Sequence, residues 1–182
     1  MKKKILVLTG SPRNGGNSDL MADAFIKGAQ AAGHEVVKVK TDEKNVRGCK
    51  ACCACYSEGA ACVFNDDFNE IAPHLESADV VAMVTPVYWY TFSAQLKAVI
   101  DKMHALYNVK KPLISEKECV LMACAEESDL EAFEGLTRSW DLIVKLLAWA
   151  EKGRLIVPGV KDVGDIKKTD ALAKAEALGS EM

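Results

Sequence analysis

The fold of this chain is decided by residues 5–18, which read ILVLTGSPRNGGNS. The first four of these residues are apolar, as is typical of a short strand buried on both faces of a parallel sheet. A glycine-rich turn follows, and residues 18–33 then place apolar side chains at helical spacing until Gly33. A strand, a tight turn and a helix in this order predict the first unit of an α/β sheet.

The same alternation continues along the rest of the chain. Short apolar runs predict four further strands, at residues 35–39, 80–84, 119–123 and 155–157. Apolar stripes predict helices over residues 92–106, 133–147 and 169–178, and Ser128 to Glu131 have the spacing of a capping box. We therefore expect an α/β fold with a five-stranded parallel sheet, in the order 2-1-3-4-5, and helices on both faces.

Length and composition limit the class of protein. A chain of 182 residues with 49% apolar and 27% charged residues predicts one globular domain over residues 1–182. A net charge of −3 argues against a nucleic-acid-binding surface, and no apolar run approaches the ~18 residues of a membrane-spanning helix. The apolar run after the basic residues 2–4 is too short for a signal sequence, so we expect a cytoplasmic protein with reduced thiols.

The turn at residues 9–18 has the features of an anion site. It follows a strand, and the helix after it presents unpaired N–H groups at its N-terminus. Ser11, Asn17 and Ser18 add short polar side chains, and Arg13 adds a guanidinium suited to phosphate oxygens. The turn is not a P-loop, since Asn17 stands where the P-loop lysine belongs. The dinucleotide pattern G-x-G-x-x-G is also absent. The alternative interpretation is a purely structural glycine turn.

A second loop, residues 85–97, reads TPVYWYTFSAQLK and follows the strand predicted to lie beside the first. In the expected strand order, both loops flank the same crevice at the carboxyl ends of the strands. Its three consecutive aromatic residues can present ring faces to a flat heteroaromatic ligand. The alternative interpretation is that these rings pack in the core or in a dimer surface.

Together the two loops resemble those of the flavodoxin-like NADPH-dependent FMN reductases. In that family G-S-x-R-x-x-x-N-[ST] holds the FMN phosphate, and P-x-Y followed by S-x-x-[LM]-K lies against the flavin ring. The resemblance implies that the phosphate is held by Ser11, Arg13, Asn17 and Ser18. It implies that the ring is lined by Pro86, Val87, Tyr88 and Trp89. A third FMN loop would follow the strand at 119–123, at Ala123, Cys124 and Ala125.

The resemblance also implies an activity. FMN would be the cofactor and NAD(P)H the co-substrate, with ping-pong hydride transfer to a flavin, quinone, nitroaromatic or similar small-molecule acceptor. Hydride transfer to a flavin needs stacking and orientation, so no catalytic acid–base residue is expected. Members of the family form dimers or tetramers, and we therefore expect a homodimer or homotetramer.

Five of the seven cysteines lie in the cysteine-rich segment, which we define as residues 44–65. Without Cys53 their spacing is C-x2-C-x2-C-x6-C, which allows thiolate ligation of an iron–sulfur cluster. The spacing resembles that of the iron–sulfur flavoproteins, close relatives in which such a motif binds a [4Fe–4S] cluster beside FMN. By this resemblance the ligands are Cys49, Cys52, Cys55 and Cys62.

Other interpretations of the cysteine-rich segment stay open. Plain flavin reductases with a similar segment leave free or redox-active thiols, and four thiolates also suit a structural zinc ion. An iron–sulfur flavoprotein would pass electrons from ferredoxin through the cluster to FMN, which is the alternative to nicotinamide chemistry. A redox or metal sensor, in which the segment changes conformation, is a third hypothesis.

Overall fold

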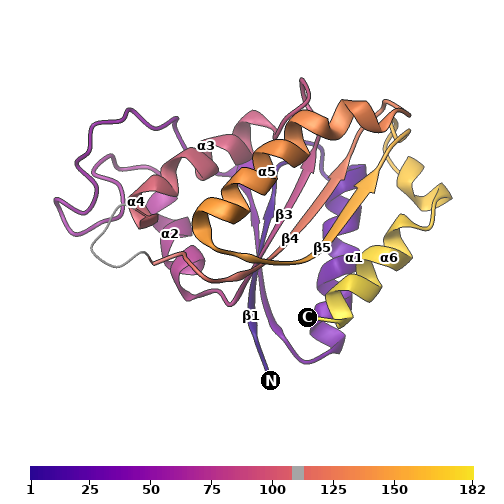
Figure 1. The fold of residues 1–182 in the computed structure, drawn as a ribbon, viewed down its shortest axis with the longest axis horizontal. Helices are drawn as coiled ribbons and strands as arrows, with labels where there is room; N and C mark the ends of the chain where they lie inside the picture. Colours follow the sequence, from indigo (N-terminus) through magenta and orange to yellow (C-terminus); the bar gives the residue numbers. More distant parts are fainter. Residues whose placement is uncertain (108–112) are drawn as a thin grey trace.

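The computed structural model describes residues 1–107 and 113–182 and places five parallel strands in one sheet, in the order β2-β1-β3-β4-β5 (Figure 1). The strands are β1 (Lys4–Thr9), β2 (Glu35–Lys40), β3 (Val80–Pro86), β4 (Glu118–Cys124) and β5 (Ala150–Val157). This sheet confirms the predicted fold class and strand order.

Helices cover both faces of the sheet (Figure 1). One face carries α1 (Asn17–Ala31) and α6 (Ala171–Ser180), and the other carries α2 (Phe68–Ser77), α3 (Ala94–Lys102) and α5 (Glu134–Leu147). Three short 3₁₀ turns, at Thr41–Glu43, Leu130–Phe133 and Asp165–Lys168, and the short helix α4 (His104–Tyr107) complete the elements.

Two apolar cores lie on the two sides of the sheet. Alternate residues of β1 supply them, since Leu6 and Leu8 belong to the core under α2, α3 and α5, and Ile5 and Val7 to the core under α1 and α6. The central strands are buried on both faces, and their sequences are therefore continuous apolar runs rather than alternating patterns.

Helices α1 and α6 approach closely at two glycines. A Cβ on Gly28 would lie 1.9 Å from the carbonyl oxygen of Glu176, and one on Gly179 would lie 2.0 Å from that of Phe25. Only residues without a side chain fit at this contact, which brings the last helix onto the first.

Several element boundaries differ from the predicted ones. The strand predicted at 155–157 begins five residues earlier, at Ala150, because its first half is an exposed strand edge with charged residues and no apolar run. The helix predicted over 92–106 divides into α3 and α4 at Met103. The predicted capping box at Ser128 is wrong, since Asp129 accepts the capping hydrogen bond and opens a 3₁₀ turn before α5.

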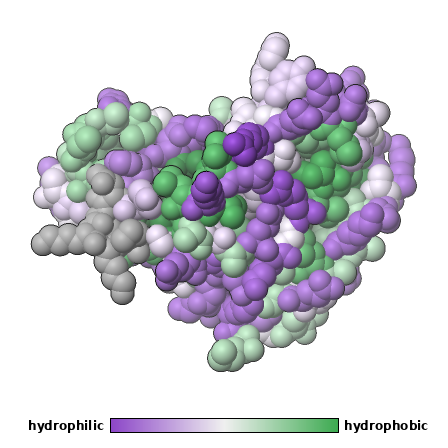
Figure 2. All heavy atoms as spheres, viewed as in Figure 1, coloured by the Kyte–Doolittle hydropathy of each residue, from purple (hydrophilic) through white to green (hydrophobic). Residues whose placement is uncertain are grey.

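The cysteine-rich segment lies between the 3₁₀ turn at Thr41–Glu43 and α2, and contains neither helix nor strand. Figure 2 shows apolar residues gathered on the surface at the left of the view, the side on which this segment lies in Figure 1. Within the described residues, no helix is long and apolar enough to cross a membrane.

Candidate functional site

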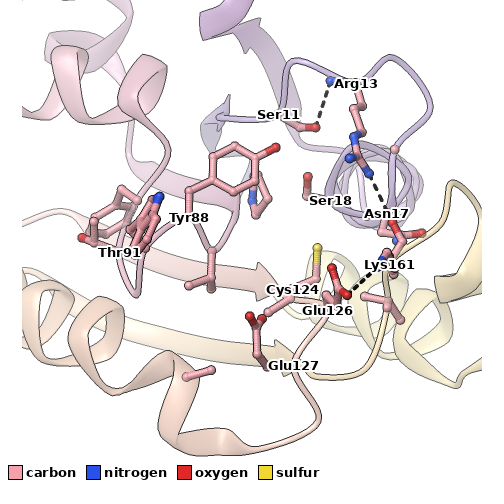
Figure 3. A pocket seen from close by; sticks show the side chains of 18 of the residues that line it. Ser11, Arg13, Asn17, Ser18, Tyr88, Thr91, Cys124, Glu126, Glu127 and Lys161 are labelled. Carbon is pink, nitrogen blue, oxygen red and sulfur yellow. Dashed lines mark hydrogen bonds and ion pairs between the residues drawn. The ribbon is translucent and has the colours of Figure 1, made fainter.

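A cavity of about 980 Å³ opens at the carboxyl ends of β1, β3 and β4 (Figure 3). Figure 3 shows Tyr88 and Thr91 on one side of it, and Arg13, Asn17 and Lys161 on the other. Ten of the eleven residues that the sequence assigned to FMN line it: Ser11, Arg13, Asn17, Ser18, Pro86, Val87, Tyr88, Trp89, Cys124 and Ala125. The two loops predicted to flank one crevice therefore do so.

The glycine-rich turn is held tightly against β3 and α3. The N–H of Gly10 donates to the carbonyl oxygen of Val84 over 2.8 Å, and a Cβ on Gly10 would lie 2.5 Å from Ser93 Oγ. The chain then enters α1, whose first N–H groups have no partner within the helix and give its N-terminus a partial positive charge. Ser11 and Ser18 are buried beside these groups, which makes this end of the cavity suitable for an anion.

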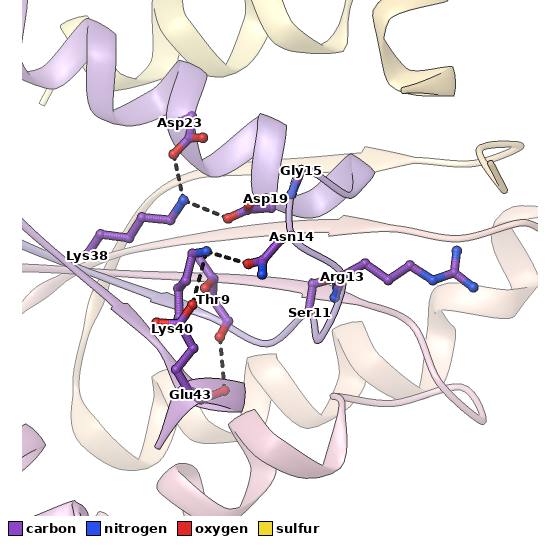
Figure 4. Close-up of polar contacts among 11 residues, drawn as sticks. Thr9, Ser11, Arg13, Asn14, Gly15, Asp19, Asp23, Lys38, Lys40 and Glu43 are labelled. Carbon is purple, nitrogen blue, oxygen red and sulfur yellow. Dashed lines mark hydrogen bonds and ion pairs between the residues drawn. The ribbon is translucent and has the colours of Figure 1, made fainter. Parts of the chain in front are cut away.

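Asp19, in the first turn of α1, fixes the shape of the same turn (Figure 4). Its carboxylate accepts the N–H of Gly15 over 2.9 Å and pairs with Lys38 Nζ at 2.6 Å. Burial alone would raise the pKa of Asp19, but Lys38 and the Gly15 N–H outweigh burial and the pKa is lowered. Asp19 is therefore ionised at neutral pH, and it supports the turn from outside the cavity.

Asn17 lines the cavity, as predicted, and also makes hydrogen bonds that the resemblance did not imply. Its Nδ2 donates to the carbonyl oxygen of Asp162 over 3.0 Å, and its Oδ1 accepts the N–H groups of Gly164 and Ile166 over 3.1 and 3.2 Å. The amide thus ties the N-terminus of α1 to the segment that follows β5. Asn17 lines the cavity, but its hydrogen bonds go to the protein backbone.

The aromatic loop is a two-residue hairpin turn. Tyr88 and Thr91 exchange both backbone hydrogen bonds at 3.1 Å, and the two residues between them, Trp89 and Tyr90, have φ of 49° and 65°. This turn normally contains Asn-Gly, because positive φ costs an ordinary residue about 1–2 kcal/mol. Two bulky aromatic residues at such positions are conformationally strained, as residues at functional sites can be.

The third predicted loop begins to line the cavity one residue later than predicted, at Cys124. Ala123 is fully buried in the core and does not line the cavity. The residues of this loop that do line it are Cys124, Ala125, Glu126 and Glu127. Burial raises the pKa of the Cys124 thiol to about 12, so the group is a neutral thiol and contributes no charge to the site.

Sequence analysis missed the part of the site that follows β5. Val160, Lys161 and Val163 line the cavity, and the carbonyl oxygen of Lys161 accepts a hydrogen bond from Arg13 over 3.2 Å. Lys161 Nζ also pairs with Glu126 at 2.6 Å. No motif marks this segment. Its position after β5 is the available signal, because the carboxyl ends of all strands of a parallel sheet lie at one edge.

The residues present fit FMN. One end of the cavity offers buried hydroxyl groups, a helix N-terminus and the Arg13 guanidinium, which together suit a phosphate group. The other end offers the apolar and aromatic side chains of Val87, Tyr88 and Trp89, which suit a flat ring system.

The cysteine-rich segment is joined to the rest of the protein by side chains near α2. Asp66 accepts the backbone N–H of Arg47 over 3.1 Å, and Asn69 accepts that of Cys62 over 2.8 Å. The Tyr56 hydroxyl donates to Glu76 over 2.6 Å. These contacts hold the segment near its start, in its middle and near its end, and the other four of its cysteines lie between them.

The cysteine thiols interact with one another but do not enclose a metal ion. Burial raises the pKa of the Cys55 thiol, and three further thiols raise it through their negative charge, namely Cys52, Cys62 and Cys49. These are the other three predicted ligands. Nevertheless, in residues 1–107 and 113–182 no three His, Cys, Asp or Glu side chains are grouped closely enough to hold a metal ion. The donor chemistry fits a cluster, whereas the arrangement of the donors does not enclose one.

The fold and the cavity define a flavodoxin-like α/β protein with a site for a phosphorylated, ring-containing cofactor. Residues 3–139 match the family model of the NADPH-dependent FMN reductases, and the chain belongs to this family. It is thus an oxidoreductase of the FMN-dependent, NAD(P)H-linked family, as predicted.

Several relatives carry a more specific name. The chain is 31% identical to an iron–sulfur flavoprotein of Archaeoglobus fulgidus, over 98% of this chain and 78% of that protein. It is 37% identical to an iron–sulfur flavoprotein of Methanosarcina thermophila over 54% of this chain, a match that spans 51% of that relative's length.

Solved structures share the fold. An NAD(P)H:quinone oxidoreductase from Methanothermobacter marburgensis superposes with a TM-score of 0.77 at 22% identity, covering 100% of this chain and 96% of that one. The azoreductase AzrA superposes with a TM-score of 0.76 at 15% identity, covering 98% and 100%. At these identities the comparison supports the fold alone.

Proposed function

We propose that this protein uses NAD(P)H to reduce a small, flat acceptor, such as a flavin, a quinone or a nitroaromatic compound, by a ping-pong mechanism. The observation that carries the proposal is that the anion-binding turn and the aromatic hairpin face each other across one cavity. Because both loops line this same open cavity, donor and acceptor would occupy the same space in succession.

The residues of this chain would bind FMN and orient it. Ser11, Arg13 and Ser18 would hold the phosphate of FMN, and Val87 and Tyr88 would lie against its ring. When bound, FMN supplies the hydride chemistry, and for this reason no protein acid or base is assigned a catalytic role. Lys161 also lines the cavity, and its ammonium group pairs with Glu126 at the surface.

Steady-state kinetics test this proposal. FMN-loaded protein is assayed with NADPH or NADH at several fixed concentrations of a soluble quinone. Parallel double-reciprocal lines are expected, because the first product leaves before the acceptor binds. Intersecting lines would contradict the ping-pong mechanism, and protein that fails to retain FMN after reconstitution would contradict the function itself.

A second candidate is electron transfer through a [4Fe–4S] cluster held by Cys49, Cys52, Cys55 and Cys62, with ferredoxin as the donor. It is favoured by the C-x2-C-x2-C-x6-C spacing of these four cysteines and by the relatives named iron–sulfur flavoproteins. Anaerobic purification followed by iron, sulfide and zinc analysis decides the matter. About four irons per chain support the cluster, one zinc supports a structural site, and neither metal supports free thiols.

A matched pair of variants makes the second test specific. Cys55→Ser should abolish cluster binding, whereas Cys53→Ser should leave it unchanged, because Cys53 is outside the proposed ligand set.

We also propose a homodimer or homotetramer formed by one domain over residues 1–182, to be tested by light scattering. Seven unpaired thiols suit a reducing compartment such as the cytoplasm.

A further inference from the structure

The hairpin tip is the most exposed aromatic feature at the cavity. The Trp89 side chain is 92% exposed and lines the cavity, as does Tyr90. A tryptophan that packs against no protein surface gains nothing from burial. Its presence at a strained turn position, where a small residue would fit better, therefore needs a reason other than folding.

The protein holds this strained tip in one place. Gly135, in the first turn of α5, lies directly against the hairpin, and a Cβ there would be 2.5 Å from the carbonyl oxygen of Tyr90. The two hydrogen bonds between Tyr88 and Thr91 fix the turn from the other side. Backbone contacts thus hold the hairpin tip in place, while the indole of Trp89 is exposed.

The cavity is large for a small-molecule site. Its volume of about 980 Å³ lies at the upper end of the ~300–1,000 Å³ that single small-molecule sites occupy. Tyr88 is 40% exposed, whereas Trp89, the next residue of the hairpin, is 92% exposed. Two aromatic residues therefore line successive parts of one cavity.

We propose that Trp89 is a specificity-determining residue, whose indole stacks on a planar aromatic acceptor as it enters the cavity. This inference rests on the proposed reductase function and names the residue that selects the acceptor at the same site. A flat ring gains dispersion and quadrupole contacts on an indole face, and a compact, non-planar acceptor does not. The strained turn presents that face with few rotatable bonds to order on binding.

Two anionic acceptors, one planar and one not, test the role of planarity. The planar probe is 1,4-naphthoquinone-2-sulfonate, and the non-planar probe is ferricyanide, which is also an anion. In FMN-loaded Trp89→Ala the KM for the naphthoquinone should rise about fivefold, and that for ferricyanide should stay within twofold. Trp89→Phe should restore most of the loss, and Leu146→Ala, an exposed residue of α5 that does not line the cavity, should change neither.

A binding measurement separates this inference from the proposed function. Calorimetric titration of the oxidised, FMN-loaded protein with the naphthoquinone gives a Kd without turnover, and the same fivefold weakening is expected in Trp89→Ala. If the wild type binds FMN but reduces neither probe, the proposed function fails, and the Kd values still decide the role of Trp89. Equal effects on both probes, or no effect on either, would overturn the inference. So would a change in subunit number with unchanged Kd, since Trp89 would then be a contact between copies.

Discussion

Lys102 and Asp66 form an ion pair that is almost completely buried, with 4% and 1% of their side chains exposed. Lys102 is the last residue of α3, and its Nζ also lies 3.6 Å from the sulfur of Cys62. Asp66 accepts backbone N–H groups from Arg47 and from Phe68, each over 3.1 Å. The pair thus joins both ends of the cysteine-rich segment to a helix that begins beside the flavin cavity.

Lys102→Met should lower the free energy of unfolding by about 3 kcal/mol, because it leaves the Asp66 carboxylate buried without its counter-ion. Urea denaturation measures this loss. Lys97→Met is the matched control on the same helix, since its i,i+4 pair with Asp101 is roughly half exposed and should contribute only about 0.5 kcal/mol. Equal losses in the two variants would show that burial of the Lys102 pair has no energetic consequence.

The same pair predicts a pH dependence. Burial raises the pKa of Asp66, but Lys102 and the two backbone N–H groups outweigh burial, so the folded-state pKa lies below the ordinary value of 3.8. A carboxyl with a lowered pKa stabilises the fold fully above its unfolded value, and this contribution is lost as the pH falls below 3.8 through the folded value. Lys102→Met removes the main group that lowers the pKa, so its acid unfolding midpoint should move to higher pH. Circular dichroism measures the midpoint. An unchanged midpoint would contradict the assignment of the lowered Asp66 pKa to Lys102.

The sequence predicted the sheet well for a physical reason. Central parallel strands are buried on both faces, and continuous apolar runs such as residues 80–84 therefore mark them clearly. The edge strand β5 was predicted only from residue 155, because the exposed half of an edge strand has no apolar pattern. The hairpin turn was not predicted, since Trp89 and Tyr90 are the opposite of the small residues that turn rules require.

The site could be predicted in outline but not in detail. Loops that follow neighbouring strands must meet, so Ser11 and Tyr88 were placed together correctly. Which side chain of a loop points into the cavity depends on packing that no spacing rule contains. Ala123 illustrates this, since it lies in the core while Cys124, the next residue, lines the cavity.

Arg13→Ala should raise the Kd for FMN about tenfold or more, because a charge-assisted hydrogen bond to phosphate is lost. The apoprotein should keep its stability, since the side chain is exposed and its bond to the carbonyl oxygen of Lys161 is at the surface. Fluorescence titration of apoprotein with FMN gives the Kd. Arg138→Ala, on the exposed side of α5, is the matched control. An unchanged Kd in Arg13→Ala would remove Arg13 from the phosphate site.

Asn17→Ala should behave in the opposite way to Arg13→Ala. Its side chain is buried and makes three hydrogen bonds to the backbone of residues 162–166, so the fold should lose about 2 kcal/mol. Hydrogen exchange at the amides of Gly164 and Ile166 should accelerate, because both lose their acceptor. Asn17→Asp keeps an acceptor for both amides and should protect them better than alanine does. If Asn17→Ala instead weakened FMN binding as Arg13→Ala does, with normal stability and exchange, Asn17 would be the phosphate ligand that the resemblance implied.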